Sequence, residues 1–480
     1  MLMISNFNLG RRQLRTRLFE VQSKPAKKQP TKSTQKLNTS YKKTRMSFSA
    51  SSSEDMDIDI PWFDNTESEL FLRSVPKVEL HVHFDGSFSP KELWDHLQRN
   101  PGLIQCIPIE QKLPWETNPN ALPFKLRELV SSCKTDLDYT RLCTCRRRYR
   151  KTRHAEESKK ALQKKTGTLE DMLLCFQFFL PLVHNNFDLL ENLAFDFVKR
   201  QKEQNVIYTE VRYSPHLLAN DPHKAHQAIT KGLRRGCIEL STVGEVCIVN
   251  QILCGIDFQP EWSADVIDMA HKLRQDFPCA VVGVDIAAGE SHFVPDSPFH
   301  DAHLDMCRKA GELGIPVTLH AGETPDSEQN VGAAIRHYGA KRIGHGYRIS
   351  MQDDVIELAK SKNIHFENCP TSSVETGAWI KTEWSDHPTI TLREKGVKVS
   401  ISSDDPAVFN TSLTWQWRIA MKKMGWEMND VFDVLEDTID AAFAPEEQKI
   451  QLRQAIQKYK ASPDLQQNPQ FNDRVQHDKK

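Results

Sequence analysis

The stretch VELHVHFDG (residues 78–86) joins a β-branched, apolar run to two histidines that are separated by a single residue. Side chains two positions apart on a β-strand project to the same face, so His81 and His83 can reach one point in space. Core histidines with hydrogen-bonded ring nitrogens would show the same spacing. The stretch therefore predicts a buried strand that carries either a structural histidine pair or two ligands of one metal ion.

Seven further runs rich in β-branched residues follow this strand, and the later ones leave room for one helix between neighbours. We expect strands at residues 206–213, 245–253, 280–287, 315–321, 341–347, 363–369 and 397–403. Strands that alternate with helical patterns indicate βαβ units and a parallel sheet. Eight such strands close most economically into a barrel. The sequence thus predicts an α/β fold, a (β/α)₈ TIM barrel with additional helices.

The near-neutral net charge of −1 conceals two strongly basic segments of the 480-residue chain. Residues 1–45 carry a net charge of +11 and residues 141–165 a net charge of +9, which leaves about −21 for the rest. An acidic body argues against general nucleic-acid binding. We predict a basic then acidic extension over residues 1–70, which we expect to be disordered. A barrel over 71–460 follows, with a basic insertion at 134–166 between strands one and two. Residues 461–480 form a tail.

The composition also bears on location and partners. No apolar run approaches 18 residues, which argues against a membrane span. The 11 cysteines include no CxxC pair, and this usage favours reduced thiols and a cytoplasmic protein. The basic, nearly acid-free start is also typical of an organelle transit peptide, so targeting to an organelle is the alternative. The oligomeric state is left open, a monomer included.

The stretch TLEDMLLCFQFFLPLV (168–183) predicts a helix that begins at a capping residue. Thr168 can accept from first-turn amides, with Asp171 three residues later. Leu169, Leu173 and Phe176 then share one helical face. Such a stripe usually packs in a core. The alternative is a lid over an apolar pocket, for which the long connection between the first two strands leaves room.

Polar residues recur where the later strands end, and these ends form the active-site face of a (β/α)₈ barrel. They carry His320 and Glu323, His345, Glu367, and the pair Asp404 and Asp405. His320 and Asp404 come from strands across the barrel and would add nitrogen and oxygen donors to His81 and His83. Imidazole suits zinc, and a catalytic zinc site keeps a position open for water or substrate. We therefore predict one Zn²⁺ per chain.

Longer stretches around these residues resemble the adenosine deaminases of the metal-dependent amidohydrolase superfamily. They are PKVELHVHFDGS, YTEVRYSPHLLA, HAGE, IGHGY, TGAW and SSDDPAVF. HAGE with GHGY and SDDP indicates the branch that acts on adenosine, AMP or adenine, whereas EVRYSPHLLA and TGAW favour adenosine itself. The resemblance runs from Pro76 to about residue 455, interrupted by the basic insertion.

The resemblance implies zinc-dependent hydrolytic deamination of adenosine, and of 2′-deoxyadenosine, to inosine and ammonia in purine salvage. His81, His83, His320 and Asp404 match the family's zinc ligands. Glu323 looks like the proton donor to purine N1, a general-acid role. His345 looks like the group that orients or deprotonates the attacking water.

Further residues match positions that bind the nucleoside. Asp85 would bind the ribose 5′-hydroxyl and Asp405 would hydrogen-bond purine N7. Ala288, beside Gly289, stands where the family usually has glycine. Its backbone N–H contact with purine N3 can survive if the backbone does not need a positive φ. The apolar helix face would cover the ribose pocket through Leu169, Met172, Leu173 and Phe176.

Two other functions remain as alternatives. A related deaminase could act on AMP, adenine or an N6-substituted purine nucleotide, although Asp85 would repel a 5′-phosphate. Less favoured is a barrel that has lost catalysis and only binds, because every expected chemical residue is present. The motif of cytidine-type deaminases is absent, so we predict a small nucleoside rather than a polynucleotide as substrate.

Overall fold

The computed structural model describes residues 67–112, 123–145, 168–242, 245–379 and 383–466. All of them belong to one compact unit, residues 60–480. Most of the predicted extension over 1–70, the predicted insertion from residue 146 onward and most of the tail lie outside the described residues. None of the described helices combines the length and apolarity that a membrane crossing requires.

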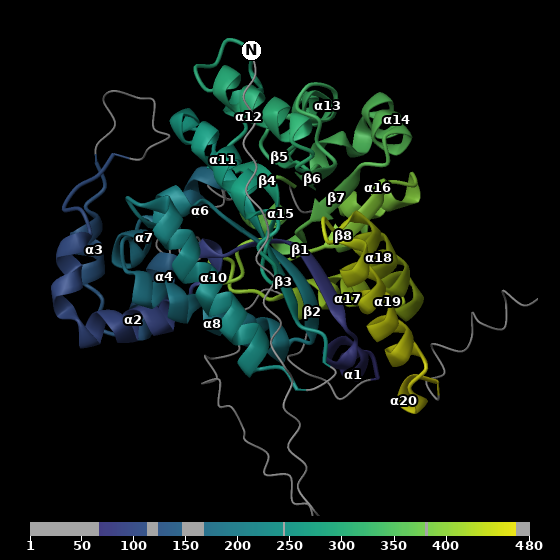
Figure 1. The fold of residues 1–480 in the computed structure, drawn as a ribbon, viewed down its shortest axis with the longest axis horizontal. Helices are drawn as coiled ribbons and strands as arrows, with labels where there is room; N and C mark the ends of the chain where they lie inside the picture. Colours follow the sequence, from purple (N-terminus) through teal and green to yellow (C-terminus); the bar gives the residue numbers. More distant parts are fainter. Residues whose placement is uncertain (1–66, 113–122, 146–167, 243–244, 380–382, 467–480) are drawn as a thin grey trace, which may run out of the picture. The chain divides into compact units, whose positions relative to one another are not determined.

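Eight parallel strands form the centre of the molecule, in two four-stranded halves (Figure 1). The first half contains β1 (Lys77–His83), β2 (Val206–Tyr213), β3 (Ile248–Ile256) and β4 (Val281–Ala287). The second contains β5 (Thr318–Ala321), β6 (Arg342–His345), β7 (His365–Asn368) and β8 (Lys398–Ile401). These confirm the eight predicted strands, with β3 displaced by three residues and β5 beginning later than expected.

A single parallel bridge joins the two halves at each seam. Val284 of β4 pairs with Val317, just before β5, and Val82 of β1 pairs with Asp404, just after β8. At the second seam the amide of His83 donates to the carbonyl of Asp404 at 2.8 Å, and the amide of Asp404 donates to the carbonyl of His81 at 3.1 Å. The predicted (β/α)₈ fold is therefore confirmed, with sparse hydrogen bonding at both seams.

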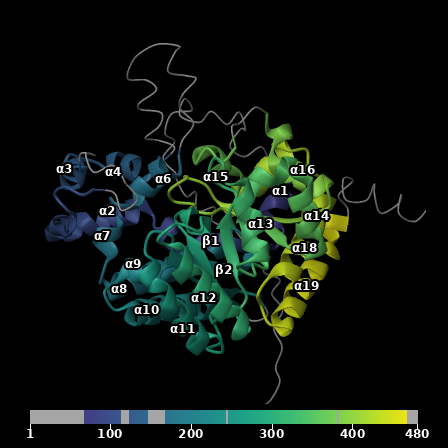
Figure 2. The same cartoon turned by 90° about the horizontal axis from the view of Figure 1, so that it is seen from above.

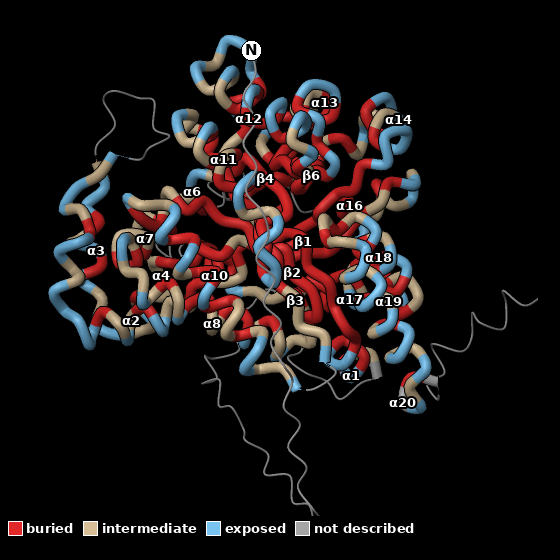
Figure 3. The backbone as a smooth tube through the Cα atoms, viewed as in Figure 1, coloured by how far each residue is buried: buried red, intermediate tan, exposed pale blue. Residues whose placement is uncertain are grey.

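Helices surround the strands, so nearly every strand residue is buried while the outer faces of the helices are exposed (Figures 2 and 3). Because both faces of a parallel sheet are covered, its strands read as continuous apolar runs. The surrounding helices are α8 (Phe187–Glu203), α9 (Pro215–Leu218), α10 (Pro222–Glu239), α11 (Ser263–Leu273), α12 (His300–Glu312), α13 (Glu328–Arg336), α14 (Asp353–Ser361), α15 (Pro370–Glu375), α16 (Pro388–Glu394), α17 (Leu413–Lys423), α18 (Met428–Ala441) and α19 (Glu446–Lys460). α1 (Glu67–Ser74) precedes β1, and α20 (Pro463–Gln466) follows α19.

The connection from β1 to β2 contains its own group of helices. They are α2 (Pro90–Arg99), α3 (Leu126–Ser131), α4 (Asp136–Cys143), α6 (Leu169–Phe176) and α7 (Leu180–Val183). Thr168 caps α6 as predicted, since its hydroxyl accepts from the amide of Asp171 at 3.2 Å. The predicted single helix over 168–183 is instead two helices, because the chain turns at 177–179 and Pro181 lies in the first turn of α7.

The described start of the predicted insertion, residues 134–145, packs onto the folded body. Tyr139 of α4 is fully buried and its hydroxyl donates to the carbonyl of Phe178 at 3.1 Å. The amide of Cys145 donates to the carbonyl of Val408 at 3.0 Å, in the segment that follows β8. This part of the connection is thus tied both to the helices between β1 and β2 and to the barrel.

Candidate active site

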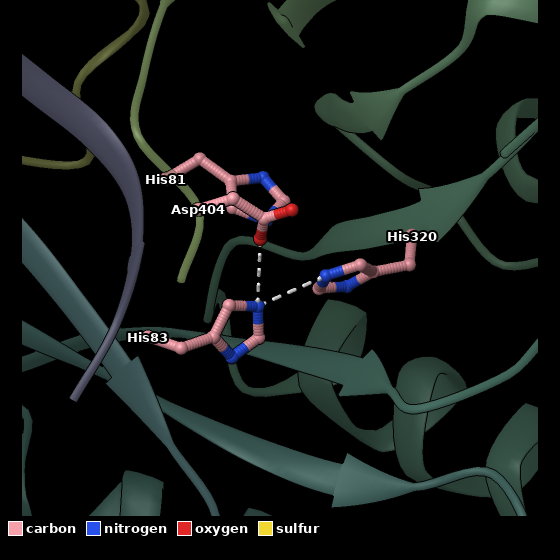
Figure 4. Close-up of side chains that lie close together, drawn as sticks. All are labelled: His81, His83, His320 and Asp404. Carbon is pink, nitrogen blue, oxygen red and sulfur yellow. Dashed lines mark hydrogen bonds and ion pairs between the residues drawn. The ribbon is translucent and has the colours of Figure 1, made fainter. Parts of the chain in front are cut away.

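Four predicted metal ligands meet at the C-terminal end of the barrel (Figure 4). The Nε2 atom of His83 lies 3.2 Å from Nε2 of His320 and 3.4 Å from Oδ1 of Asp404. The Nε2 atom of His81 lies 3.1 Å from the same Asp404 oxygen. All four ligand atoms lie within 4.8 Å of one another. The strand that opened the sequence argument therefore supplies two of four converging donors.

The hydrogen bonds around this cluster fit a bound metal ion. Nδ1 of His81 donates to Oε2 of Glu367 at 2.9 Å, and Nδ1 of His320 donates to Oδ2 of Asp285 at 3.0 Å. Each carboxylate fixes the tautomer that leaves the Nε2 lone pair facing the cluster, as is usual for metal-ligating histidines. Nε2 of His81 is buried without a hydrogen-bond partner among the described residues. Three nitrogens and one oxygen thus form a set of donors that can hold a metal ion.

Two arginines hold the supporting carboxylates from behind. Arg212 donates to Glu367 and to Asp285, both at 2.7 Å, and Arg342 donates to Glu367 at 2.6 Å. All four side chains are buried. Burial alone would raise the pKa of Glu367, but the two arginines hold that pKa well below its usual range. The carboxylates behind the histidines are therefore fixed as anions.

Two residues at the metal-ligand cluster have a left-handed backbone although neither is glycine. His345, the last residue of β6, has φ 68°, and Asp404 has φ 62°. This conformation costs roughly 1–2 kcal/mol per residue and is found preferentially at functional sites. Nε2 of His345 lies 3.5 Å from Oε2 of Glu323, and burial lowers the pKa of His345 well below its usual value. His345 is therefore a neutral imidazole that can accept a proton.

A cavity opens in front of the cluster. Every site residue predicted from the sequence lines it, except His81. The face of α6 that carries Leu169, Met172, Leu173 and Phe176 forms an apolar wall. Leu174 and Cys175 of the same helix do not line the cavity and are also buried. The two interpretations of this stripe thus combine, since α6 both packs into the core and covers a pocket.

Three carboxyl groups reach this cavity with an oxygen that has no hydrogen-bond partner among the described residues: Asp85 Oδ1, Glu323 Oε1 and Asp405 Oδ1. Burial and the Asp404 carboxylate raise the pKa of Glu323 to about 8 and that of Asp405 well above its usual value. Burial raises the pKa of Asp85 to about 7. A Cβ at Gly86 would lie 1.7 Å from Oδ1 of Asp405, so glycine is required beside these carboxyls.

The loop after β4 differs from the sequence expectation at Ala288. The backbone contact of this residue was expected to survive if a positive φ was not needed, but its φ is 70°. Ala288 therefore carries the strain that glycine would avoid. The next residue, Gly289, has no positive φ, yet a Cβ there would lie 2.5 Å from Oδ2 of Asp257. Glycine at 289 is explained by crowding rather than by backbone conformation.

Several residues of the site were not singled out by the sequence analysis. Arg212 and Asp285 lie inside the apolar runs of β2 and β4, where a charged residue in a buried strand was the available signal. Glu367 was noted only as a polar strand end. Glu290, beside Gly289, lines the cavity, and the sequence analysis did not consider it.

Comparison with known proteins places these residues in a family. The profile of the adenosine deaminase family matches residues 150–459, which contain His320, Glu323 and Asp404 but begin after β1. Bovine adenosine deaminase is 27% identical over 403 residues, covering 81% of this chain and 95% of the bovine protein. Adenosine deaminase of Xenopus tropicalis is 29% identical over 401 residues, covering 80% and 95%. The apo structure of the N6-methyl-AMP deaminase from Arabidopsis thaliana shares the fold, with a TM-score of 0.60, 21% identity, and coverage of 82% of this chain and 99% of that one.

Proposed function

The chain belongs to the adenosine deaminase family, and from that premise we propose that it hydrolyses adenosine, and 2′-deoxyadenosine, to inosine and ammonia with one bound zinc ion. The reaction would serve purine salvage. Support comes from a cluster of three histidines and one aspartate beside a buried acid, at the mouth of a barrel where such enzymes carry their sites.

The ionisable groups that line the cavity favour a nucleoside over a nucleotide as the substrate. Five carboxyl side chains line it: Asp85, Glu290, Glu323, Asp404 and Asp405. None of the described residues that line it is Lys or Arg. A 5′-phosphate would lose its water without gaining a cation. This distribution favours adenosine over AMP or an N6-substituted nucleotide.

The cluster and its neighbours divide the chemistry of water attack. His81, His83, His320 and Asp404 would hold the zinc ion, which would supply a Lewis acid that makes water a nucleophile at neutral pH. The neutral imidazole of His345 then accepts a proton from the attacking water.

The acids in front of the cluster act on the purine. Glu323 donates a proton to N1, which withdraws electron density from C6 and stabilises the tetrahedral adduct. A pKa of about 8 keeps that proton in place at neutral pH. Asp405 is protonated too and donates to N7, while the backbone N–H of Ala288 faces N3. Asp85 binds the 5′-hydroxyl, and the apolar face of α6 covers the ribose.

The decisive experiment combines a zinc assay with ammonia release by the wild type and by Glu323→Gln. We expect retained zinc and a kcat lower by a factor on the order of 10² or more, since general acid catalysis contributes at least that much. Because Glu323 acts in its protonated form, the wild-type kcat should fall as the pH rises through about 8. Glu312→Gln, an exposed change on α12, is the matched control and should leave kcat unchanged.

The same assay tests the substrate. Adenosine, AMP, adenine and N6-methyl-AMP are compared at equal concentration, and a higher kcat/KM for any of the last three would contradict the proposal. The cytoplasmic location stays a prediction, which fractionation of the native protein tests. The oligomeric state, which the sequence left open, can be measured by light scattering.

A further inference from the structure

We propose that Glu290 is a positioning residue: its carboxylate binds the backbone of the loop after β5 and thereby holds the Glu323 carboxyl in the cavity. The functional part of this inference rests on the proposed function, because it concerns the proton donor of that reaction. The structural part, that Glu290 holds the loop, does not depend on any substrate.

The Glu290 carboxylate accepts hydrogen bonds from three successive backbone amides. Oε1 accepts from the amide of Glu323 at 2.8 Å and of Thr324 at 3.0 Å, and Oε2 accepts from the amide of Gly322 at 2.8 Å. The side-chain amide of Asn330, on α13, donates to Oε2 at 2.8 Å. The hydroxyl of Thr324 also lies 3.3 Å from Oε1, so both oxygens are occupied by protein groups.

These amides need such an acceptor because they leave regular structure there. β5 ends at Ala321 and α13 begins at Glu328, so the strand ladder and the helix leave the amides of 322–324 without partners. Glu323 is 5% exposed, and buried N–H groups without an acceptor cost roughly 1–3 kcal/mol each. One side chain therefore satisfies the whole turn that carries the proton donor.

The two residues that follow Glu290 are held by a second carboxylate. Asp257, which follows β3, accepts from the amide of Ser291 at 3.2 Å, from the amide of His292 at 2.8 Å and from Nδ1 of His292 at 2.7 Å. The amide of Asp257 donates to the carbonyl of Ala287, at the end of β4, at 2.9 Å. Asp257 thus ties the segment that carries Glu290 to the ends of β3 and β4, and Glu290 in turn binds the loop after β5.

Glu290 lines the same cavity as Glu323, but both of its oxygens are occupied by protein donors. It therefore acts through the loop rather than on the substrate. Catalytic groups must be held to within a fraction of an ångström, and a displacement of 1 Å can lower a rate by a factor of about 10². Loss of the Glu290 carboxylate should consequently affect the chemical step more than binding of the nucleoside.

The test uses full-length, zinc-loaded protein carrying Glu290→Gln. The glutamine amide keeps the shape but turns N–H donors toward backbone N–H donors. We expect kcat for adenosine to fall by about 10–100-fold while KM and the inhibition constant of inosine change by less than about 3-fold. Asp326→Asn, an exposed carboxylate in the same loop, is the matched control and should behave as the wild type. An unchanged kcat, or a rise in KM as large as the fall in kcat, would overturn the positioning role.

The variant Glu290→Asp distinguishes the length of the side chain from its negative charge. It keeps the negative charge but shortens the side chain by one methylene, so it cannot span all three amides and should remain impaired. Full activity in this variant would mean that charge alone matters and would refute the proposal.

Hydrogen exchange provides a readout that needs no substrate. The amides of residues 322–324 should exchange at least 10-fold faster in Glu290→Gln than in the wild type, with amides of β6 unchanged. Equal exchange would refute the hold on the loop. Absence of adenosine deamination by the wild type would instead contradict the proposed function and leave the exchange result to decide this inference.

Discussion

Two sets of buried carboxyl groups lie on opposite sides of the histidine cluster, and the protein treats them in opposite ways. Behind the cluster, Asp285 and Glu367 each pair with Arg212, and their pKa values are lowered although burial would raise them. In front of it, Asp85 and Asp405 each have an oxygen without a described partner, and burial raises their pKa values. All four carboxyl groups are buried, so the difference in their pKa values comes from their partners.

The difference separates groups that support from groups that act. A carboxylate saturated by arginine and histidine N–H groups has no capacity left for a ligand, and it fixes the ring it contacts. A carboxyl that keeps its proton and a free oxygen can exchange hydrogen bonds with a substrate, at a cost to the stability of the empty protein. The following changes test this division, from the largest expected effect to the smallest.

Replacing Arg212 with methionine should cause the largest loss of stability. It leaves Asp285 and Glu367 as buried anions that have lost their shared cation, and breaking a buried pair in this way costs about 3–5 kcal/mol. The free energy of unfolding, measured by denaturant titration, should fall by that amount. Arg308→Met, which breaks an exposed pair with Asp305 on α12, should change it by less than about 1 kcal/mol. If Arg212→Met lowered the free energy of unfolding as little as the control does, the supporting role of Asp285 and Glu367 would be refuted.

Replacing Glu367 with glutamine should weaken metal binding. The variant loses the charged acceptor for Nδ1 of His81, and removal of such a partner typically lowers metal affinity 10–100-fold. Zinc titration against a competing chelator measures the effect. Glu357→Gln, an exposed change on α14, is the matched control and should retain wild-type affinity. Unchanged affinity in Glu367→Gln would show that this hydrogen bond does not tune the site.

Replacing Asp85 with asparagine should have opposite effects on function and stability. Because the folded pKa of about 7 exceeds the unfolded value, the stability of the wild type falls as the pH rises from about 4 through 7. Asparagine cannot ionise, so the variant should be more stable than the wild type at pH 8, by up to about 4 kcal/mol, and similar to it at pH 4. KM for adenosine should rise about 10-fold. If the variant were less stable than the wild type at pH 8, the buried charge of Asp85 would have to be stabilised by a partner, against this interpretation.

Replacing Ala288 with glycine should have the smallest effect, because it only relieves backbone strain in the loop after β4. We expect a gain of about 0.5–1 kcal/mol in the free energy of unfolding, since glycine adopts φ 70° without steric cost. Asn363→Gly offers a control at φ 52°, where asparagine is already tolerated, and should gain less. A loss of stability in Ala288→Gly would mean that alanine contributes packing that outweighs the strain.

The strand pattern and the polar strand ends could be read from the sequence because both are local features. Runs such as VIYTEVRY and AVVGVDIA mark buried strands by composition alone, and a parallel barrel brings all their C-terminal ends to one face. His320 and Asp404 could therefore be assigned to the same rim as His81 without knowledge of any distance.

The partners of Arg212 could not be predicted, because they depend on which inward-facing residues of β4 and β7 lie at the same level of the barrel. The left-handed backbone of Ala288, His345 and Asp404 also has no local signal, since none of them is glycine. The role of Glu290 required the path of a second loop, and its neighbours in sequence say nothing about residues 322–324. Long-range register and backbone strain thus account for what the sequence left open.

The seam between β1 and β8 has a mechanical consequence. His81 and His83 belong to one half of the barrel, whereas His320 belongs to the other and Asp404 follows the strand that completes it, and a single bridge joins the halves beside them. An ion shared by these four side chains is therefore also a cross-link between two half-barrels. Its binding free energy adds to the free energy that keeps the halves together. An ion bound for catalysis would then also stabilise the closed barrel around the active site.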